Sequence, residues 1–367
     1  MYCVIRVNAY PHLGNGHLMR CLTLARIAQQ QGCTVVFVLA DYSNTPVRFI
    51  EAAGFNYVLV PIADELADAA HCAKLLEDLQ APCRVVVDVY ALSATWHAFI
   101  YPRCDQLMVI DDLANRNYYC DHLLDHTPGR TAACYASWVN QQANIYAGCD
   151  HALLAPEFFA AVGDARKIRA AACSSKRPLK LLISLGGTDP KSLSQVWFNL
   201  LAPHLDAFAQ VTFLLASNAV GLASLAKKIA IAQAGGSKVD LVVDARNVAQ
   251  LLLQHDLAIG GAGVSALERA VLGLPSLLLT LADNQVFQAQ TLIKEGCALD
   301  LGDWQQVPSL DVQQKALNSL LALVQDKTRY EYLSQQAFNL IAPGQPYQAV
   351  HKFLTQPRSD YPLSSGC

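Results

Sequence analysis

The sequence of 367 residues is poor in charge, since only 16% of its residues are Asp, Glu, Lys or Arg, against about a quarter in an average globular protein. The 27 basic and 30 acidic residues nearly cancel, and no long run of Lys or Arg occurs, so we expect no nucleic-acid partner. Hydrophobic residues make up 53% of the chain, which excludes an intrinsically disordered protein. This balance is typical of parallel strands that are buried on both faces.

Long apolar runs are also absent. No stretch reaches the ~18 uninterrupted apolar residues that a membrane-spanning helix needs, so we expect no membrane insertion. The first residues lack the basic lead and the cleavage site of a signal peptide. We therefore expect a cytoplasmic protein whose 12 cysteines are reduced thiols, with no Cys-x-x-Cys pair to form a zinc ribbon. The sequence does not indicate an oligomeric state.

Several catalytic signatures are missing as well. The chain contains no Gly-x-Ser-x-Gly elbow and no Walker loop, which removes support for serine-hydrolase and P-loop chemistry. Asp111 and Asp112 could hold a divalent ion, but nothing supplies the remaining ligands. Cys120, His122 and His126 lack a recognised zinc spacing. We therefore expect neither a bound metal nor another cofactor.

Strand-like and helix-like runs alternate along the chain, which predicts two Rossmann-like domains with doubly wound parallel sheets. We predict the first domain at residues 1–162 and the second at residues 179–340, with a C-terminal helix and a frayed tail at residues 341–367. The basic, Ala-rich segment 163–178 is predicted to be a linker. Two such domains would face a cleft, and ligands bind at the carboxyl ends of parallel strands, so the loops that follow strands are the candidate sites.

The loop after the first strand contains Gly14 and Gly16 and leads into a helix, whose free amides and dipole favour an anion. His17 and Arg20 are three residues apart and share one face of this helix. The helix N-terminus disfavours a charged imidazole, so His17 is a candidate general base. The alternative is a histidine that only caps the helix or packs against it.

Two loops of the second domain are rich in glycine. Gly186, Gly187 and Thr188 could approach a diphosphate, although an ordinary turn with Thr or Asp capping the next helix explains them equally well. The second loop, residues 260–263, ends in a helix that carries Ser265 and Glu268. Its amides could hold phosphate while Glu268 accepts ribose hydroxyls. The alternative for Glu268 is a solvated helix face.

Asn284 and Gln285 follow the next predicted strand. Consecutive amide side chains at the carboxyl end of a strand suit sugar hydroxyls or phosphate, and a helix cap is the alternative.

A nicotinamide cofactor is a further alternative. Gly14-x-Gly16 resembles the start of a dinucleotide fingerprint with Asp41 as the ribose ligand, but Met19 occupies the place of the third glycine. The pattern from Gly261 to Ala266 matches formally, yet it comes late in its domain and not in the first βα turn.

The candidate motifs occur in the order that one family shows. They are Arg6-Val-Asn8, Gly14-Asn-Gly16-His17 with Arg20 and Cys21, Asp88-Val-Tyr90, Asp111-Asp112, Cys120-Asp121, residues 152–158, residues 185–189, residues 261–268, and Asn284-Gln285. On these motifs the sequence resembles the UDP-2,4-diacetamido-2,4,6-trideoxy-β-L-altropyranose hydrolases of pseudaminic acid biosynthesis. The resemblance covers most of the chain.

The resemblance implies a GT-B-like fold and the hydrolysis of a UDP-linked diacetamido-trideoxy amino sugar to UDP and free sugar, without a metal. It implies that His17 is catalytic, that residues 261–268 hold UDP and that Asn284 faces the diphosphate or the sugar. The substrate-binding residues that we carry forward are Asn8, Gly14, Gly16, Arg20, Asp88, Tyr90, Gly186, Gly187, Thr188, Gly261, Gly263, Ser265, Glu268, Asn284 and Gln285.

The sequence departs from the family at two positions. Asn8 stands where the family usually has Asp, and Ala155 stands where it usually has Arg. Asn8 loses a charge that could steady a base, and Ala155 removes a substrate contact. A GT-B glycosyltransferase that uses a UDP-sugar, or a non-catalytic UDP-sugar-binding relative, therefore stays open as an alternative.

Overall fold

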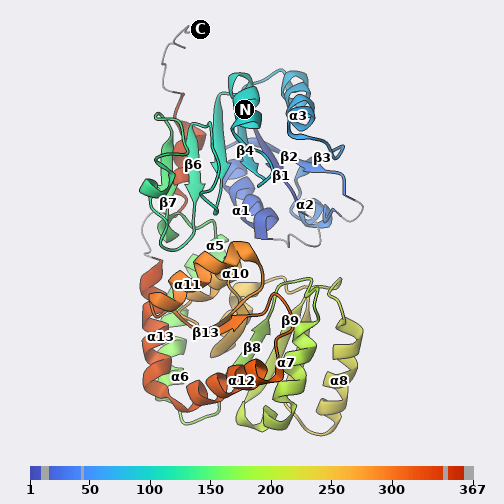
Figure 1. The fold of residues 1–367 in the computed structure, drawn as a ribbon, viewed down its shortest axis with the longest axis vertical. Helices are drawn as coiled ribbons and strands as arrows, with labels where there is room; N and C mark the ends of the chain where they lie inside the picture. Colours follow the sequence, from blue (N-terminus) through green and yellow to red (C-terminus); the bar gives the residue numbers. More distant parts are fainter. Residues whose placement is uncertain (10–15, 43–44, 342–345, 359–367) are drawn as a thin grey trace. The chain divides into compact units, whose positions relative to one another are not determined.

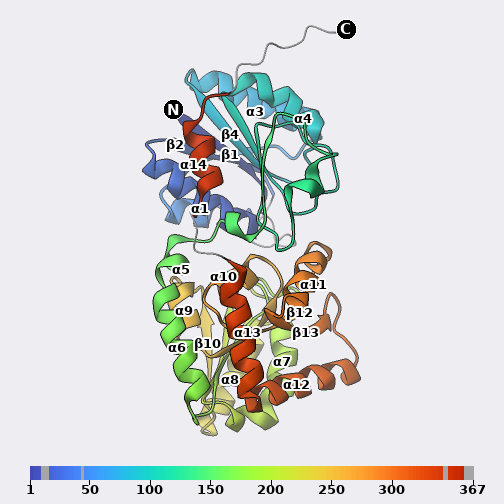
Figure 2. The same ribbon diagram turned by 90° about the vertical axis from the view of Figure 1, so that its left-hand side faces the viewer.

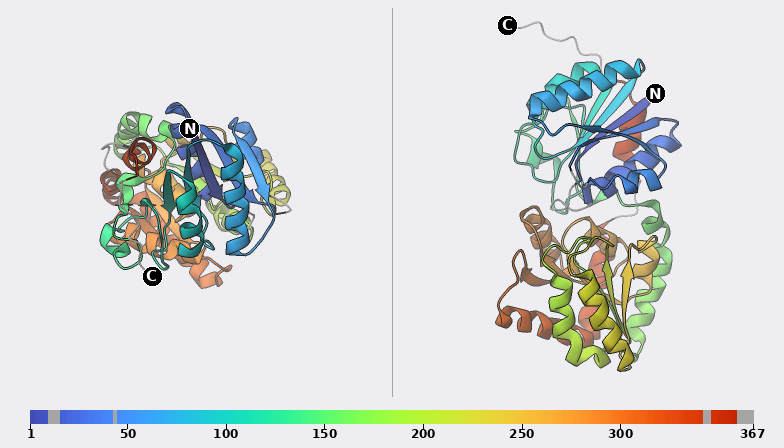
Figure 3. Two further views of the ribbon diagram at one scale, coloured as in Figure 1. Left: turned by 90° about the horizontal axis from the view of Figure 1, so that it is seen from above. Right: turned by 90° about the vertical axis from the view of Figure 1, so that its right-hand side faces the viewer.

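The computed structural model describes residues 1–9, 16–42, 45–341 and 346–358, which form two compact units (Figure 1). Of the described residues, the first unit contains 1–9, 17–42, 45–153 and 346–358, and the second contains Gly16 and residues 154–341. Each unit contains a parallel sheet with helices on both faces, as the alternation of strands and helices predicts (Figure 3).

The first sheet has, in the described part of the chain, seven parallel strands in the order β3-β2-β1-β4-β5-β6-β7. They are β1 (Tyr2–Val7), β2 (Thr34–Ala40), β3 (Asn56–Val60), β4 (Cys83–Asp88), β5 (Gln106–Ile110), β6 (His122–Asp125) and β7 (Asn144–Ala147). The central strands are almost completely buried, because helices cover both faces. The strand order reverses between β1 and β4, and the carboxyl ends of the strands at such a reversal are where open parallel sheets generally bind ligands.

Two layers of helices cover this sheet. One apolar core joins it to α1 (Gly16–Gln30), α2 (Arg48–Ala52) and α14 (Gln348–Thr355), and a second core joins the opposite face to α3 (Glu65–Leu79) and α4 (Ala94–Ile100). Figure 2 shows α14 beside α1. The last helix of the described chain therefore returns to the first unit.

The second sheet has six parallel strands, within the described residues, in the order β10-β9-β8-β11-β12-β13. They are β8 (Lys180–Ser184), β9 (Gln210–Leu215), β10 (Val239–Val243), β11 (Leu257–Gly261), β12 (Ser276–Thr280) and β13 (Ala298–Asp303). The helices of this unit are α5 (Pro156–Ala160), α6 (Val162–Ser174), α7 (Leu193–Leu201), α8 (Leu222–Ala234), α9 (Val248–Leu253), α10 (Val264–Val271), α11 (Val286–Lys294), α12 (Leu310–Gln325) and α13 (Lys327–Leu340). The order reverses between β8 and β11, so the two glycine loops follow neighbouring strands.

The prediction of a linker at residues 163–178 is wrong for most of that range, because α6 occupies Val162–Ser174. Its Ala-rich sequence favours a helix. Arg169 is buried on this helix and donates hydrogen bonds to the carbonyls of Leu252, His255 and Leu272. Arg169, one of the basic residues on which the linker prediction was based, therefore attaches α6 to the rest of the second unit.

The C-terminal helix that we predicted is α14, whereas the predicted frayed tail at 359–367 lies outside the described residues. Arg358, just before it, binds Asp121 through Nη2 at 2.9 Å and stacks its guanidinium 3.7 Å from the ring centroid of Tyr101.

Candidate functional site

The first candidate site pairs His17 with Asp88. α1 brings His17 to the carboxyl end of β1, and Asp88 is the last residue of the neighbouring strand β4. His17 Nδ1 lies 2.7 Å from Asp88 Oδ1, and both side chains are buried. Burial opposes the charge of Asp88, but Arg20 and His17 outweigh burial and hold the pKa of this carboxyl well below its usual range. Arg20 Nη2, which can only donate, lies 2.9 Å from the same Nδ1. The hydrogen bond to the Asp88 carboxylate requires a proton on Nδ1, and in the neutral tautomer that makes this bond Nε2 keeps a lone pair.

Arg20 uses its donors inside the protein. Its Nε and Nη2 lie 2.7 and 2.6 Å from the two carboxylate oxygens of Asp88, and its Nη1 lies 3.0 Å from Asp112 Oδ2. The same Nη1 also lies 3.5 Å from His126 Nε2. The guanidinium therefore orients carboxylates, and its substrate contact stays a prediction. Asp88, which is fully buried, likewise orients His17, and its substrate contact also stays a prediction.

Tyr90 follows β4 and completes this cluster. Its hydroxyl donates to Asp112 Oδ1 at 2.6 Å, and its ring meets the His17 ring edge-on with centroids 4.7 Å apart. Burial opposes ionisation of Asp112, but the charges of Arg20 and His17 lower its pKa. His17, Arg20, Asp88, Asp112 and Tyr90 thus form one connected network at the switch point of the first sheet.

Asn8 follows β1 and is buried. Its Oδ1 accepts hydrogen bonds from Arg6 Nη1 at 2.6 Å and from the amide of Ala40 at 3.2 Å, which join the ends of β1 and β2. These bonds give Asn8 a structural role, while its substrate contact stays a prediction. Gly14 lies outside the described residues, and Gly16 is the first residue of α1. Ala155 precedes α5.

In the second unit, the turn at residues 186–189 confirms the capping alternative. Asp189 is buried, and its carboxylate accepts hydrogen bonds from the amides of Leu193 at 2.8 Å and Ser194 at 2.9 Å, at the start of α7. The carbonyls of Gly187 and Thr188 accept from the amides of Ala216 and Val220. Gly186 has φ +90°, a conformation that glycine adopts without strain. The turn is therefore fastened at several points, while binding by Gly186, Gly187 and Thr188 stays a prediction.

The loop before α10 requires glycine for close packing. A Cβ on Gly260 would lie 2.5 Å from Arg269 Nη1 and 2.9 Å from the carbonyl oxygen of Ser184. Arg269 is buried below the loop, where its Nη2 donates to the carbonyl of Gly261 at 2.8 Å and its Nη1 to Ser265 Oγ at 3.3 Å. Burial lowers the pKa of Arg269 to about 10. That Arg269 supports this loop was not predicted from the sequence.

The start of α10 is suited to an anion. Gly263 is its N-cap and supplies no side-chain acceptor, so no cap residue competes for the first amides of the helix. The Gly263 carbonyl is fixed by Gln288 Nε2 at 2.8 Å. Gly261, Gly263 and Ser265 therefore come together at one helix N-terminus, as the sequence predicts.

Gln285 joins two of the candidate loops. Its Oε1 accepts from the amide of Ala262 and from the amide of Leu281, each at 3.2 Å. This oxygen therefore holds the loops after β11 and β12 together, while binding of a sugar hydroxyl or phosphate by Gln285 stays a prediction. Asn284 lies next to it in a short 3-10 helix, Asp283–Gln285, and is exposed.

Glu268 lies one turn into α10 and is half-buried. Burial raises the pKa of its carboxyl to about 7, and the charge of Glu157 on α5 raises it further, while Arg269 lowers it. Glu268 therefore changes charge near neutral pH.

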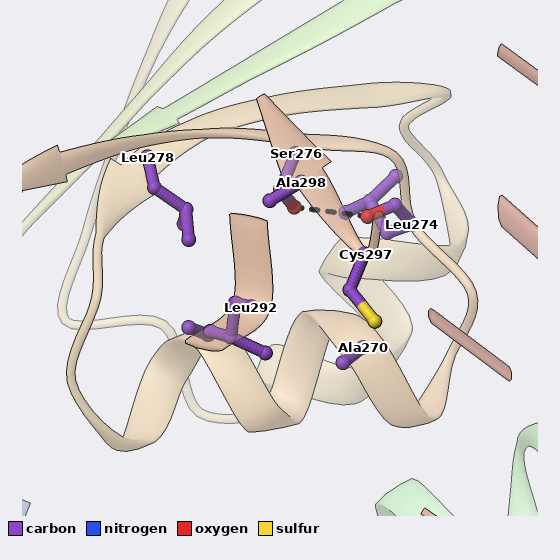
Figure 4. Close-up of a pocket in the computed structure, with 8 residues that line it drawn as sticks. Ala270, Leu274, Ser276, Leu278, Leu292, Cys297 and Ala298 are labelled. Carbon is purple, nitrogen blue, oxygen red and sulfur yellow. Dashed lines mark hydrogen bonds between the residues drawn. The ribbon is translucent and has the colours of Figure 1, made fainter. Parts of the chain in front are cut away.

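A small cavity lies between α10, α11 and the strands β12 and β13 (Figure 4). Its volume of about 10 Å³ admits no more than a water-sized molecule, so it cannot hold a nucleotide. It is lined by Ala266, Ala270, Leu274, Ser276, Leu278, Leu292, Cys297 and Ala298.

The residues considered as metal ligands have other partners. Asp111 accepts from the amides of Leu113 and Ala114 and from Arg116 at 2.7 Å, and His122 Nε2 lies 2.5 Å from Gln106 Oε1. Within the described ranges, no three His, Cys, Asp or Glu side chains are grouped so that they could hold a metal ion. None of the described helices is both long and apolar enough to span a membrane.

No family model matches the sequence. The chain is 32% identical over 176 residues to the spore coat polysaccharide biosynthesis protein SpsG of Bacillus subtilis, a match that covers 47% of the chain and 48% of that protein. It is 22% identical over 274 residues to the uncharacterized protein MJ1062 of Methanocaldococcus jannaschii, with coverage of 73% and 53%. The chain thus spans about half the length of the curated relatives that it matches.

Solved structures match nearly the whole chain. MurG of Acinetobacter baumannii superposes with a TM-score of 0.66 at 14% identity, over 96% of this chain and 98% of that one. The glycosyltransferase WaaG, which acts in lipopolysaccharide biosynthesis, gives 0.55 at 13% identity and the same coverages. The Anabaena protein HepE, solved with UDP and glucose, gives 0.57 at 12% identity over 97% and 100%. The two parallel-sheet, Rossmann-like units therefore have the GT-B glycosyltransferase fold that the sequence predicts.

Proposed function

We propose that this protein cleaves the bond between UDP and the anomeric carbon of a UDP-linked sugar, with His17 as the general base. The observation that carries the proposal is the pair of His17 and Asp88. In the tautomer that donates from Nδ1 to this carboxylate, Nε2 can take a proton from an attacking hydroxyl. The departing diphosphate carries negative charge, and free amides at a helix start stabilise such charge.

The second unit supplies the nucleotide site in this proposal. The amides at the start of α10 receive the diphosphate, and the Glu268 carboxylate accepts ribose hydroxyls one turn further along. Gln285 and Arg269 hold the loop in shape. HepE was solved with UDP, which supports a nucleotide in a protein of this fold.

The attacking hydroxyl belongs to one of two acceptors. Transfer to a second sugar or another hydroxyl compound has the broader support, because the matching structures include glycosyltransferases and the Bacillus subtilis relative is named for polysaccharide biosynthesis. Transfer to water, which makes the protein a hydrolase of a diacetamido-trideoxy sugar in nonulosonic acid biosynthesis, is supported by the ordered motifs of the sequence. Both reactions use the same base and the same leaving group.

The deciding experiment measures UDP release from a panel of UDP-amino sugars, first in water alone and then with candidate acceptors. Release in water alone supports the hydrolase, and release that requires an acceptor supports the transferase. Tight binding without release under any condition contradicts catalysis and indicates a binding protein.

Replacing His17 by Ala tests the base directly. We expect turnover to fall by ~100-fold or more, the usual contribution of a general base, while UDP affinity changes little. The matched control is His71→Ala, which removes an exposed histidine from α3. Near-normal turnover of His17→Ala would demote His17 to a structural residue.

A further inference from the structure

The cluster around His17 carries an unbalanced charge. Asp88 and Asp112 supply two buried or nearly buried carboxylates, and Arg20 is the cation that contacts both. Two negative charges against one positive charge leave one negative charge when the His17 ring is neutral. A proton on His17 brings the sum of these four side chains to zero.

The other titratable groups that face the cluster do not alter this sum. Arg116, whose guanidinium lies 5.9 Å from the centroid of the Tyr90 ring, is paired with Asp111 at 2.7 Å. Burial lowers the pKa of His126, 3.5 Å from Arg20, to about 3, so this histidine is neutral. Burial and the nearby Asp88 raise the pKa of Cys21, whose Sγ lies 3.5 Å from Asp88, so the thiol keeps its proton. Tyr90 contributes a hydroxyl that donates to Asp112. The cluster therefore depends on Asp112 for its excess negative charge.

Asp88 alone cannot supply that excess. Arg20 binds both of its carboxylate oxygens, so the pair of Arg20 and Asp88 is neutral as a unit. Asp112 meets the remaining face of the guanidinium at 3.0 Å and adds one more negative charge. Its second oxygen holds Tyr90, whose ring lies edge-on against His17. Asp112 therefore acts on His17 through its charge and through the shared contacts with Arg20 and Tyr90.

We infer that Asp112 is a positioning residue that leaves the His17 cluster one positive charge short of neutrality, so that the proton taken from the attacking hydroxyl completes its charge balance. This inference rests on the proposed function. In the reaction, the O–H bond of the acceptor breaks and its proton goes to Nε2. The oxygen forms the bond to the anomeric carbon, and the electron pair of the old C–O bond leaves with UDP. The Nδ1 proton stays in the hydrogen bond to Asp88.

The test is an NMR titration of the His17 ring protons in the full-length protein, which needs no turnover. In Asp112→Asn we expect the titration midpoint to move to lower pH by roughly one unit, because the ring loses a nearby negative charge. Asp112→Glu restores the charge and should move the midpoint back toward that of the unchanged protein. Asp105→Asn, which removes an exposed carboxylate at the opposite end of β5, is the matched control and should not shift it.

A second variant separates charge from contact. Tyr90→Phe removes the hydroxyl that Asp112 holds but keeps every charge, so the midpoint should stay within a few tenths of a unit. An unchanged midpoint in Asp112→Asn overturns the inference, as does an equal shift in Tyr90→Phe. If Asp112→Asn does not fold, Asp112→Ser removes the same charge with a smaller side chain and is judged by the same criterion.

Kinetics connect the cluster to catalysis. We expect the low-pH limb of the kcat profile in Asp112→Asn to move in the same direction as the NMR midpoint, with little change in KM. A midpoint that shifts while the protein releases no UDP contradicts the proposed function and leaves the charge coupling intact. A kcat profile that stays fixed while the midpoint moves shows that His17 is not the base.

Discussion

At the scale of single residues, the structure contains a second pair of buried carboxyl groups, Asp111 and Asp125, which share the hydroxyl of Tyr135. Asp125, the last residue of β6, is fully buried, and its Oδ2 lies 2.7 Å from the hydroxyl of Tyr135. The same hydroxyl lies 3.0 Å from Asp111 Oδ2. Tyr135 has one proton for two carboxylates, so both hydrogen bonds form only if one of the two carboxyls carries a proton and donates it to the phenol oxygen. Asp111 already accepts from Arg116 and from two backbone amides, which favours the proton on Asp125. Burial raises the pKa of Asp125 to about 6, in agreement with this arrangement.

Asp125→Asn tests this protonation through stability. The pKa of Asp125 is higher in the folded state than in the unfolded state. Below about pH 4 the carboxyl is protonated in both states, so its burial does not lower the free energy of unfolding. As the pH rises toward 6, the free energy of unfolding decreases. The loss amounts to about 3 kcal/mol for a shift of about two units. Asn is neutral at every pH and its amide can donate to Tyr135, so we expect the variant to gain stability relative to the unchanged protein between pH 4 and 7. Urea unfolding followed through the NMR signals of β6 measures the difference, with the exposed Asp150→Asn as control.

For Glu268 we predict that rising pH strengthens UDP binding, whereas for Asp125 rising pH lowers stability. Its pKa is raised to about 7, so the carboxylate form that accepts ribose hydroxyls most strongly is gained as pH rises from 6 to 8. We expect UDP affinity to increase over this range more in the unchanged protein than in Glu268→Gln. Glu268→Ala should weaken UDP by roughly 1–3 kcal/mol at pH 8. Calorimetry with the exposed Glu295→Gln as control checks both, and equal affinities in all variants would remove Glu268 from the site.

At the scale of elements, α14 shows how a distant segment stabilises the first unit. Its side chains Ala349, Val350, Phe353 and Leu354 are buried in the same core as α1 and β1. The Arg84 side chain of β4 hydrogen-bonds the carbonyl of Phe353, and Gln106 of β5 reaches the carbonyl of Gln356 at 3.1 Å. The helix is therefore held by both apolar and polar contacts.

Phe353→Ala measures the contribution of this helix. The ring is fully buried, so its loss should lower the free energy of unfolding of the first unit by about 3–5 kcal/mol. His351→Ala removes an exposed side chain from the same helix and should cost little. Thermal or urea unfolding followed through signals of β1 and β4 distinguishes the two. Equal stabilities would show that α14 is not part of the cooperative core.

Most elements could be predicted from the sequence because their apolar residues have a clear period. The apolar pattern predicts a strand at residues 34–40 and helices at residues 193–201 and 222–234, and β2, α7 and α8 agree with these ranges at both ends. It does not predict β3, β7 or β13, which are partly exposed. Local pattern also could not show that Arg169 is buried, because its acceptors are carbonyls more than 80 residues away.

In the candidate site, too, features with a local sequence signal could be predicted, whereas contacts between residues distant in sequence could not. His17 and the helix start near Gly263 were predicted because glycine loops before helices are local signals. The pairing of His17 with Asp88 could not be predicted, because 71 residues separate them in sequence and only the pairing of β1 with β4 brings them together. The contacts of Gln285 could not be predicted either, because its Oε1 joins two loops that follow different strands.

At the scale of the whole molecule, both sheets use the same topology. In each, the strand order reverses beside the first strand of the unit, between β1 and β4 and between β8 and β11. The His17 cluster lies at the first reversal, and the loop before α10 follows β11 at the second. The base and the anion-binding amides that the proposed function requires thus come from different units, each at the position where parallel sheets bind ligands.

The proposed anion-binding amides predict that turnover does not require a divalent metal. The negative charge of departing UDP can be met by the amides at the start of α10. The adjacent carboxylates Asp111 and Asp112 are each in contact with a guanidinium group, since Arg116 lies 2.7 Å from the first and Arg20 lies 3.0 Å from the second. A cation at this pair would have to displace those guanidinium groups. We therefore expect UDP release to proceed at an unchanged rate after treatment with excess EDTA. Loss of activity in the chelator that magnesium or manganese restores would contradict this and make Asp111 and Asp112 the first ligands to replace.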